Sequence, residues 1–332
     1  MTLHSSPARE EITRAAAILR AGGIGGIPTE TVYGLGADAF QPQALARVFD
    51  VKGRPHFDPL IVHLADIGWI DRVAREFPAN ARRLAERFWP GPLTLVVPKL
   101  PTVPDLATAG LETVAVRVPD HPVAHALIEE AATPIAAPSA NLFGRISPTT
   151  AQHVVDQLGD KIDFVLDGGP CRVGVESTVI LVQHNRLALL RPGGLTVEEV
   201  EACLGAVDWF DPVETAASRA GMVAPGMLPQ HYAPRTPLTV VPEGEATGTA
   251  TRWMKEQPNL QVGILALRTS SDAPTPYIEV LSSDGDLREA AAGFFASLRR
   301  LDALALDRIV AERFPERGLG RALNDRLTRA AG

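Results

Sequence analysis

Apolar and polar positions along the first two thirds of the chain follow helical spacing in some segments and form short β-branched runs in others. Helical spacing predicts helices over 8–21, 41–51 and 121–132, two helices over 66–88 that break at Pro78, and one that starts near Pro148 with Ser147 as N-cap. Apolar runs predict strands in GIGGI, PLIVHL (59–64), LTLVV (93–97), TVAVRV (113–118), 134–137, DFVLDGG, STVILV and RLALL. A Gly-rich turn is expected around Tyr33. Helices alternating with strands, some of them adjacent strands, predict an α/β unit with a mixed sheet.

The pattern fails between about 205 and 237, where Pro, Gly, Ala and Ser are frequent. After this stretch, PLTVV, VGILAL, YIEVL and DRIVAE predict strands, and helical spacing predicts helices over 285–304 and 318–331. Such an alternation is typical of a small Rossmann-like domain with three layers. We therefore expect domains at 1–207 and 238–332, joined by a linker or lid at 208–237.

Length and charge narrow the class of protein. A chain of 332 residues usually forms two domains, and a net charge of −7 argues against a protein wrapped in nucleic acid. Cys171 and Cys203 do not form a disulfide framework, so we expect a reducing compartment. The first residues lack the apolar core of a signal peptide, and no stretch is long enough to span a bilayer. The expected location is the cytoplasm, without membrane contact.

Several common catalytic patterns are absent from the sequence. No segment matches a Walker A loop, and the glycines at 22–26 do not follow a strand as a Rossmann loop does. His121 and His125 have the i, i+4 spacing of metal ligands but lack the accompanying Glu, which favours surface or helix N-terminal histidines. A nucleophile elbow is also missing, so a hydrolase triad is not supported.

Polar residues instead gather at element ends, in PTETVYGLG (28–36), KGRPHFDPLIVH (52–63) and APSANLFGRISPTTA (137–151), and again in ESTV (176–179) and RPGG (191–194). Phosphates bind at the rims of α/β sheets and at helix N-termini. Each loop also has a structural explanation: a capped turn, cations that neutralise a helix end, or a core histidine at His63. Taken together, they predict a pocket for a triphosphate and an amino acid, built from Thr31, Lys52, Arg54, His63, Arg117, Ser139, Asn141, Ser177 and Arg191.

This combination of motifs resembles the YrdC-like domain of threonylcarbamoyl-AMP synthases over about residues 8–205. The segment APGMLPQHYAPRTPL and the later GLGRALNDRL resemble the two-domain members of that family. The resemblance implies a YrdC-like twisted mixed sheet. It also implies an ATP-binding nucleotidyltransferase that joins L-threonine, bicarbonate or CO2, and ATP into L-threonylcarbamoyl-AMP and pyrophosphate. The product would pass to the tRNA threonylcarbamoyl transferase machinery for tRNA modification to threonylcarbamoyladenosine.

The resemblance also assigns residues. Lys52 and Arg54 would be catalytic, with Mg²⁺ arriving with ATP and no metal ligand supplied by the protein. Threonine would be held by Thr31, His63, Arg117, Ala137 and Ser177. ATP would be surrounded by Lys52, Arg54, Asp58, Thr113, Ser139, Asn141, Ser147, Arg191, His231 and Tyr232.

Some positions depart from the family pattern. Asn usually stands at Asp58, Thr at Pro138 and Ser at Ala224. An acid at position 58 would repel phosphate unless Mg²⁺ lay between them. The competing hypotheses are a carbamoyltransferase, whose zinc fingers two cysteines cannot build, and a protein that binds RNA by shape. The acidic balance disfavours RNA binding as the main function but leaves a weak tRNA contact open.

Overall fold

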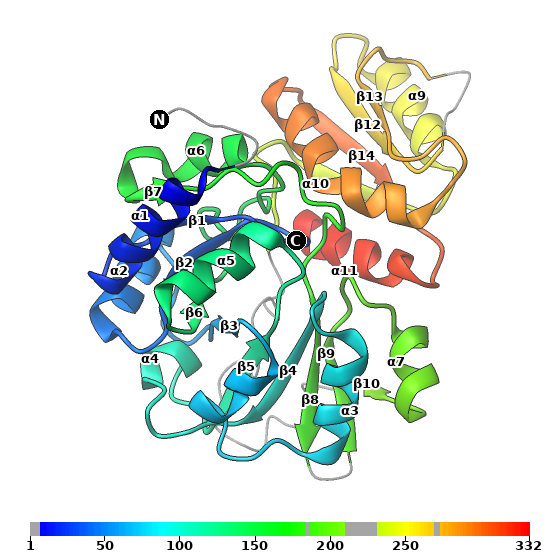
Figure 1. Ribbon diagram of the computed structural model, residues 1–332. Helices are drawn as coiled ribbons and strands as arrows, with labels where there is room; N and C mark the ends of the chain where they lie inside the picture. Colours follow the sequence, from blue (N-terminus) through cyan, green and yellow to red (C-terminus); the bar gives the residue numbers. More distant parts are fainter. Residues whose placement is uncertain (1–6, 184–185, 210–230, 269–272) are drawn as a thin grey trace. The chain divides into compact units, whose positions relative to one another are not determined.

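The computed structural model describes residues 7–183, 186–209, 231–268 and 273–332 (Figure 1). These residues divide into two compact units. The first unit falls within 1–143, 148–172 and 176–227, and the second within 144–147, 173–175 and 228–332. The second unit therefore includes two short segments that come from the first half of the chain.

The first unit is built on a ten-stranded mixed sheet in the order β10-β9-β8-β4-β5-β3-β6-β2-β1-β7. The strands are β1 (Gly25–Ile27), β2 (Gly34–Asp38), β3 (Ile61–His63), β4 (Leu93–Pro98), β5 (Thr113–Arg117), β6 (Ile135–Ala136), β7 (Phe164–Val165), β8 (Thr178–Gln183), β9 (Arg186–Arg191) and β10 (Asp208–Trp209). The helices are α1 (Arg9–Arg20), α2 (Pro42–Lys52), η1 (Ile67–Arg72), α3 (Ala79–Phe88), α4 (Asp105–Thr108), α5 (Pro122–Ala131), α6 (Ala151–Leu158), η2 (Gly159–Lys161) and α7 (Val197–Leu204).

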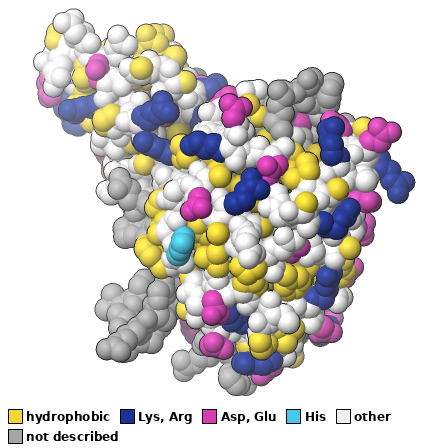
Figure 2. All heavy atoms as spheres, turned by 90° about the vertical axis from the view of Figure 1, so that its left-hand side faces the viewer, with side chains coloured by type: hydrophobic (Ala, Val, Ile, Leu, Met, Phe, Trp, Pro, Cys, Tyr) yellow, Lys and Arg dark blue, Asp and Glu magenta, His cyan; other side chains and the backbone are white. Residues whose placement is uncertain are grey.

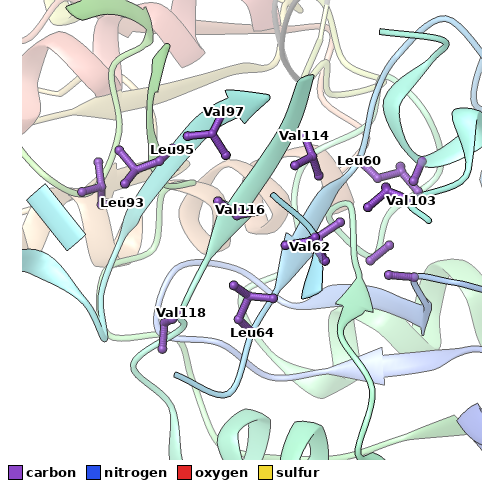
Figure 3. Packing of buried hydrophobic residues seen from close by; sticks show 14 of the residues in the cluster. Leu60, Val62, Leu64, Leu93, Leu95, Val97, Val103, Val114, Val116 and Val118 are labelled. Atoms are coloured by element: carbon purple, nitrogen blue, oxygen red, sulfur yellow. The ribbon is translucent and has the colours of Figure 1, made fainter. Parts of the chain in front are cut away.

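One face of the central strands forms the main hydrophobic core of this unit. Figure 3 shows alternate residues of β4 and β5 contributing side chains to it, among them Leu95 and Val116. Because side chains alternate across a strand, the intervening residues Thr94, Ala115 and Arg117 lie on the opposite face. The opposite face is therefore free to carry polar groups.

Four details of the first unit differ from the sequence-based expectations. Residues after Tyr33 form β2 rather than a turn, because Gly34–Asp38 pair antiparallel with β1. Helix α6 begins at Ala151, and its N-cap is Thr150, whose hydroxyl accepts from the His153 amide, so Ser147 is not the cap. Helices α4 and α7 were not anticipated. Strand β10, which pairs with β9, occupies the first two residues of the expected linker.

The second unit has a four-stranded parallel sheet in the order β11-β14-β12-β13. Its elements are β11 (Leu238–Val241), α9 (Ala246–Glu256), β12 (Val262–Ala266), β13 (Ile278–Val280), α10 (Leu287–Ala303), β14 (Arg308–Glu312) and α11 (Leu319–Ala331). Figure 1 shows α9 on one side of this sheet and α10 with α11 on the other. The predicted fold class, a mixed α/β sheet with a smaller Rossmann-like domain, is confirmed. Helix α9 was not predicted, and residues 210–230 of the expected linker or lid lie outside the described residues.

Candidate functional site

Several of the site candidates lie on the sheet face opposite the main core. The register of the parallel strands β3 and β5 pairs His63 with Arg117, the last residue of each strand. On β5, Thr113 and Ala115 lie on the same face as Arg117, because side chains of one face recur every second residue. Thr113 is half-buried at the other end of this row, so the face spans the length of β5.

A small group of aliphatic residues forms the floor of this face. Its members are Ile61, Val96, Ala115, Val179, Leu181 and Leu190. The charged and hydroxyl side chains surround this floor, so a ligand lying on it would meet apolar atoms below and polar atoms at its ends. Such a mixture is typical of small-molecule sites.

Arg117 is the centre of the first polar group. Its Nη1 donates to Thr31 Oγ1 at 2.9 Å and its Nε to the Gly91 carbonyl at 3.1 Å. Its Nη2 lies 2.6 Å from Oε2 of Glu30, an ion pair whose direction does not suit a hydrogen bond. Both charged side chains are buried, which fixes the guanidinium in one orientation.

The Thr31 hydroxyl is oriented by a chain of hydrogen bonds. Thr29 Oγ1 donates to the Val32 carbonyl at 2.6 Å and lies 2.9 Å from Thr31 Oγ1. Since the Thr29 proton is committed to Val32, the Thr31 hydroxyl donates to Thr29 and accepts from Arg117. The predicted pairing of Thr31 with Arg117 in one site is therefore present in the structure.

His63 lies beside this group as a neutral side chain. Its Nδ1 lies 3.3 Å from the Ile135 carbonyl, which can only accept, so Nδ1 carries a proton. Burial, reinforced by the nearby Arg117 charge, lowers the pKa of His63 to about 3. His63 also lines a cavity of about 10 Å³. The other lining residues are Ile27, Thr29, Gly34, Pro119, Ala124, Ile128, Ile135 and Ala137, so the walls are largely apolar.

A second polar group joins strands β4, β8 and β9. Ser177 Oγ lies 2.7 Å from Thr94 Oγ1, and Arg191 Nη2 donates to Ser177 Oγ at 3.2 Å and to its carbonyl at 2.9 Å. The register shifts between β8 and β9 at this point, where Val179 pairs with Arg191 but Ile180 with Leu189. This bulge at Leu190 places the Arg191 side chain on the site face.

Lys52, the last residue of α2, holds the loop that follows β6. Its Nζ donates to the Ser139 carbonyl at 2.6 Å and to the Asn141 carbonyl at 2.5 Å. Burial, together with the Arg54 charge, lowers the pKa of Lys52 well below its ordinary value. The structure thus connects the predicted K-x-R and S-x-N motifs through the side chain of Lys52.

Asp58 is paired with Arg54 rather than left as an isolated acid. Arg54 Nη2 lies 2.8 Å from Asp58 Oδ2, and its Nε donates to the Asp58 carbonyl at 3.1 Å. Burial raises the pKa of the Asp58 carboxyl, and the nearby charges of Arg54, Lys52 and Arg191 act in the opposite direction. Arg54 therefore compensates the charge of Asp58 in this structure. The expectation that Mg²⁺ lies between Asp58 and a bound phosphate stays a prediction.

The backbone around Ala137 accounts for the departure at Pro138. The Ala137 amide donates to the Ile61 carbonyl at 2.9 Å, and the Pro138 carbonyl accepts from the Leu35 amide at 2.7 Å. A proline suits this position because the strand interaction uses only its carbonyl.

Three predicted ATP contacts belong to the second unit. Ser147 is fully buried there, and its carbonyl accepts from Arg299 Nε at 3.3 Å. The His231 amide donates to the Arg329 carbonyl at 3.0 Å, and the buried Tyr232 ring lies 5.5 Å from the Phe295 ring. These contacts place Ser147, His231 and Tyr232 within their own unit, and their role toward ATP stays a prediction.

Sequence reasoning missed two members of the site. Glu30 lies in the PTETVYGLG segment but was not among the predicted site residues, although it forms the buried ion pair with Arg117. Thr94 sits in a run that reads as pure strand, although it contacts Ser177. A hydroxyl inside an otherwise aliphatic β-branched run is the available signal for Thr94. His121 is the N-cap of α5, as expected, since its Nδ1 accepts from the Val123 amide.

Among the described residues, His, Cys, Asp and Glu side chains form no cluster of three that would hold a metal ion. The described helices include none both long and apolar enough to cross a membrane. Figure 2 shows acidic and basic side chains mixed over the visible face, which differs from the continuous basic surface typical of RNA-binding proteins.

Comparison with known proteins covers both units. Residues 17–193 match the Sua5/YciO/YrdC family, described as "Telomere recombination", and residues 195–332 match the "Threonylcarbamoyl-AMP synthase, C-terminal domain". Threonylcarbamoyl-AMP synthases of Bacillus subtilis and Pyrococcus abyssi are 42% and 43% identical over 97% of this chain, covering 93% and 94% of their own lengths. The crystal structure of P. abyssi Sua5 complexed with L-threonine superposes with a TM-score of 0.91 at 41% identity, covering 99% of this chain and 96% of that one.

Proposed function

The chain belongs to the threonylcarbamoyl-AMP synthase family, and from that premise we propose the reaction that its sheet face carries out. The chain is an enzyme that condenses L-threonine, bicarbonate or CO2, and ATP into L-threonylcarbamoyl-AMP and pyrophosphate, in tRNA modification. Its reaction class is nucleotidyl transfer. The observation that carries the proposal is that the first unit holds both the Arg117–Thr31 group and a cationic group around Asp58.

Threonine would bind at the Arg117 end of the face. The fixed guanidinium of Arg117, which the Thr31 hydroxyl helps to orient, offers N–H donors to a carboxylate. Ser177 lies just before β8, two strands from β5 in the sheet. The cavity beside His63 and Ala137 has apolar walls and a volume of about 10 Å³, which suits a methyl group. A neutral His63 would leave the threonine carboxylate to Arg117 without adding a competing cation.

ATP would bind along the rest of the face, toward Lys52, Arg54 and Arg191. These cations surround one acid, Asp58, so the group keeps a net positive charge that favours phosphates. Ser139 and Asn141 lie in the loop that Lys52 holds, and Thr113 is accessible at the far end of β5. The carboxylate of Asp58 is committed to Arg54, so the described residues here offer Mg²⁺ no ready ligand set. Mg²⁺ would therefore enter as part of the MgATP substrate.

The chemistry needs positioning rather than a covalent intermediate. A carbamate oxygen of N-carboxythreonine would attack the α-phosphorus of ATP, the bond from that phosphorus to the bridging oxygen would break, and pyrophosphate would leave. Negative charge develops on the leaving pyrophosphate, and fixed cations such as Lys52, Arg54 and Arg191 stabilise such charge most when water is excluded.

The direct test is pyrophosphate release from ATP in the presence and absence of each co-substrate. We expect release only when threonine, bicarbonate and MgATP are all present, and we expect threonylcarbamoyl-AMP by mass spectrometry. Serine should react with a lower kcat/KM, because losing one buried methyl costs about 1–3 kcal/mol, or about 5- to 150-fold. Release that did not depend on threonine would rule out the assignment, and release with carbamoyl phosphate in place of threonine would favour a carbamoyltransferase.

A further inference from the structure

The second unit contains a cavity of about 180 Å³ at the carboxyl ends of its parallel strands. It is lined by residues that follow β11 and β12 and by the last residue of β14, namely Glu243, Gly244, Thr247, Ala266, Leu267, Arg268 and Glu312. All of these belong to the second unit, so the cavity is independent of the sheet face described above.

The connections of the sheet explain why a cavity forms there. The chain leaves β11 for α9, which contacts the sheet on one side, and leaves β14 for α11, which packs with α10 on the other side. β11 and β14 are neighbours, so the chain diverges to opposite faces between them. In open parallel sheets, ligands bind in the crevice that such a divergence leaves at the carboxyl edge.

Glu312 gives this crevice a preorganised acid. Its side chain is buried, its Oε2 accepts from the Gly244 amide at 2.9 Å, and its Oε1 accepts from the Leu267 amide at 2.9 Å. It thereby ties the loops after β11 and β12 to the end of β14. No cation of the described chain pairs with it within 4.0 Å, although a buried carboxylate is usually matched by a positive charge.

Groups of opposite charge also line the cavity without pairing. Arg268 is exposed at one side and Glu243 at another, and no ion pair joins either of them to Glu312 or to other described residues. The first turn of α9, with Thr247, adds amide and hydroxyl groups, and no side chain caps this helix end. Both charge signs therefore remain available to one small molecule.

We propose that this crevice binds a small zwitterion of the α-amino acid class, with its carboxylate toward Arg268 and Thr247 and its ammonium toward Glu312 and Glu243. Arg268 and Thr247 supply donors, and the two glutamates supply acceptors, which matches the two ends of an amino acid. A nucleotide is the disfavoured alternative, because two acids at the cavity would repel its phosphates.

The test is isothermal titration calorimetry on the full chain with glycine, L-alanine, L-aspartate and L-lysine as probes, and AMP as the competing class. These probes avoid threonine, so the result does not depend on the proposed reaction. We expect at least one of these amino acids to bind with a dissociation constant of about 1 mM or below. We expect Arg268→Ala and Glu312→Gln each to weaken that binding about tenfold or more.

Arg313→Ala is the matched control, since Arg313 follows Glu312 in sequence, is exposed and does not line the cavity. It should change binding by less than about twofold. Arg268 is an exposed residue, so its variant keeps the test open even if Glu312→Gln unfolds the second unit. Absence of binding by every amino acid, binding that survives Arg268→Ala, or binding of AMP alone would each overturn the proposal.

Discussion

At the residue scale, the site depends on buried charges that hold one another in place. Glu30 pairs with Arg117 and Asp58 with Arg54, and Lys52 is held by two carbonyls. Removing one member of such a set leaves the other buried and uncompensated, which costs more than the contact itself is worth. Substitutions here should therefore be judged by folding and by turnover together.

Lys52→Ala should lower kcat/KM by about 10- to 150-fold, corresponding to about 1.5–3 kcal/mol, through a lost phosphate contact and a loosened Ser139–Asn141 loop. Steady-state kinetics and thermal melting should be recorded together. Lys161→Ala, at an exposed lysine of the same unit, is the control. Turnover within about twofold of the parent would mean that Lys52 serves only to hold the loop.

Asp58→Asn should lower the KM for ATP a few-fold, because it removes the acid from among Lys52, Arg54 and Arg191 while keeping the side-chain size. The variant also takes the ion-pair partner from Arg54, so its melting temperature is expected to fall. Kinetics at low and high salt provide the check, since an electrostatic gain should shrink as salt rises. A higher KM at low salt would show that Arg54 needs Asp58 for its orientation.

His63 should make the folded protein sensitive to acid. In the unfolded chain, His63 binds a proton as the pH falls through about 6.5. In the folded protein, its pKa of about 3 keeps it neutral until the pH is much lower. The folded state therefore loses stability across that window and regains it above 6.5. In urea unfolding, the stability of the parent relative to His63→Gln should drop by about 2–3 kcal/mol between pH 7.5 and 4.5. A difference that did not change with pH would contradict a neutral, buried His63.

At the element scale, close backbone approaches fix the strands of the site. A side chain at Gly193 would place its Cβ 2.3 Å from the Glu176 carbonyl oxygen and 2.4 Å from the Ser177 carbonyl carbon. The RPGG segment can therefore lie against ESTV only with glycine at this position. This contact sets the distance between Arg191 and Ser177.

Gly193→Ala should destabilise the first unit by about 1–3 kcal/mol and raise the KM for ATP, because the two segments must move apart. Thermal melting and ATP kinetics measure the two effects. Gly293→Ala is the control. Gly293 lies inside α10, where alanine favours the helix, and the added Cβ would lie an ordinary 3.8 Å from the Leu281 side chain. An unchanged KM for Gly193→Ala would show that Arg191 does not contact ATP.

The elements also show what could be predicted from the sequence. Long periodic segments such as α1, α2 and α10 were placed within about two residues, because amphipathic spacing records burial directly. Strand β2 was missed because GLGAD has no apolar alternation, although its partner β1 lies just before it in the chain. The partnership of Glu30 with Arg117 was missed because the two residues are far apart in the sequence and β5 is not a sheet neighbour of β1.

At the scale of the whole molecule, the boundary between units does not follow chain order. Segments 144–147 and 173–175 belong to the second unit, and Arg299 donates to the carbonyls of Ile146 and Ser147. A truncation that ended near residue 212 would remove the partners of these segments. Point variants in the full chain are therefore the cleaner way to assign the second unit a role.

Tyr232→Phe in the full chain tests whether the start of the second unit reaches ATP. Phenylalanine keeps the ring packed between Phe295 and Arg326 and removes only the hydroxyl. If Tyr232 contacts the nucleotide, the KM for ATP should rise several-fold, or about 0.5–1.5 kcal/mol, with little change in melting temperature. Tyr277→Phe, a second tyrosine of the same unit, serves as the control. If Tyr232→Phe and Tyr277→Phe had the same KM for ATP, Tyr232 would serve only in packing.

The strand order of the second unit has a consequence for biosynthesis. β14 pairs with both β11 and β12 and follows both in the chain, so it leaves the ribosome after them. Until β14 emerges, β11 has no partner in its sheet, and the nascent chain presents unpaired strand edges of the kind that promote aggregation. The order of these strands thus delays pairing of β11 until β14 has emerged, so premature termination before β14 should yield a chain that depends on chaperones.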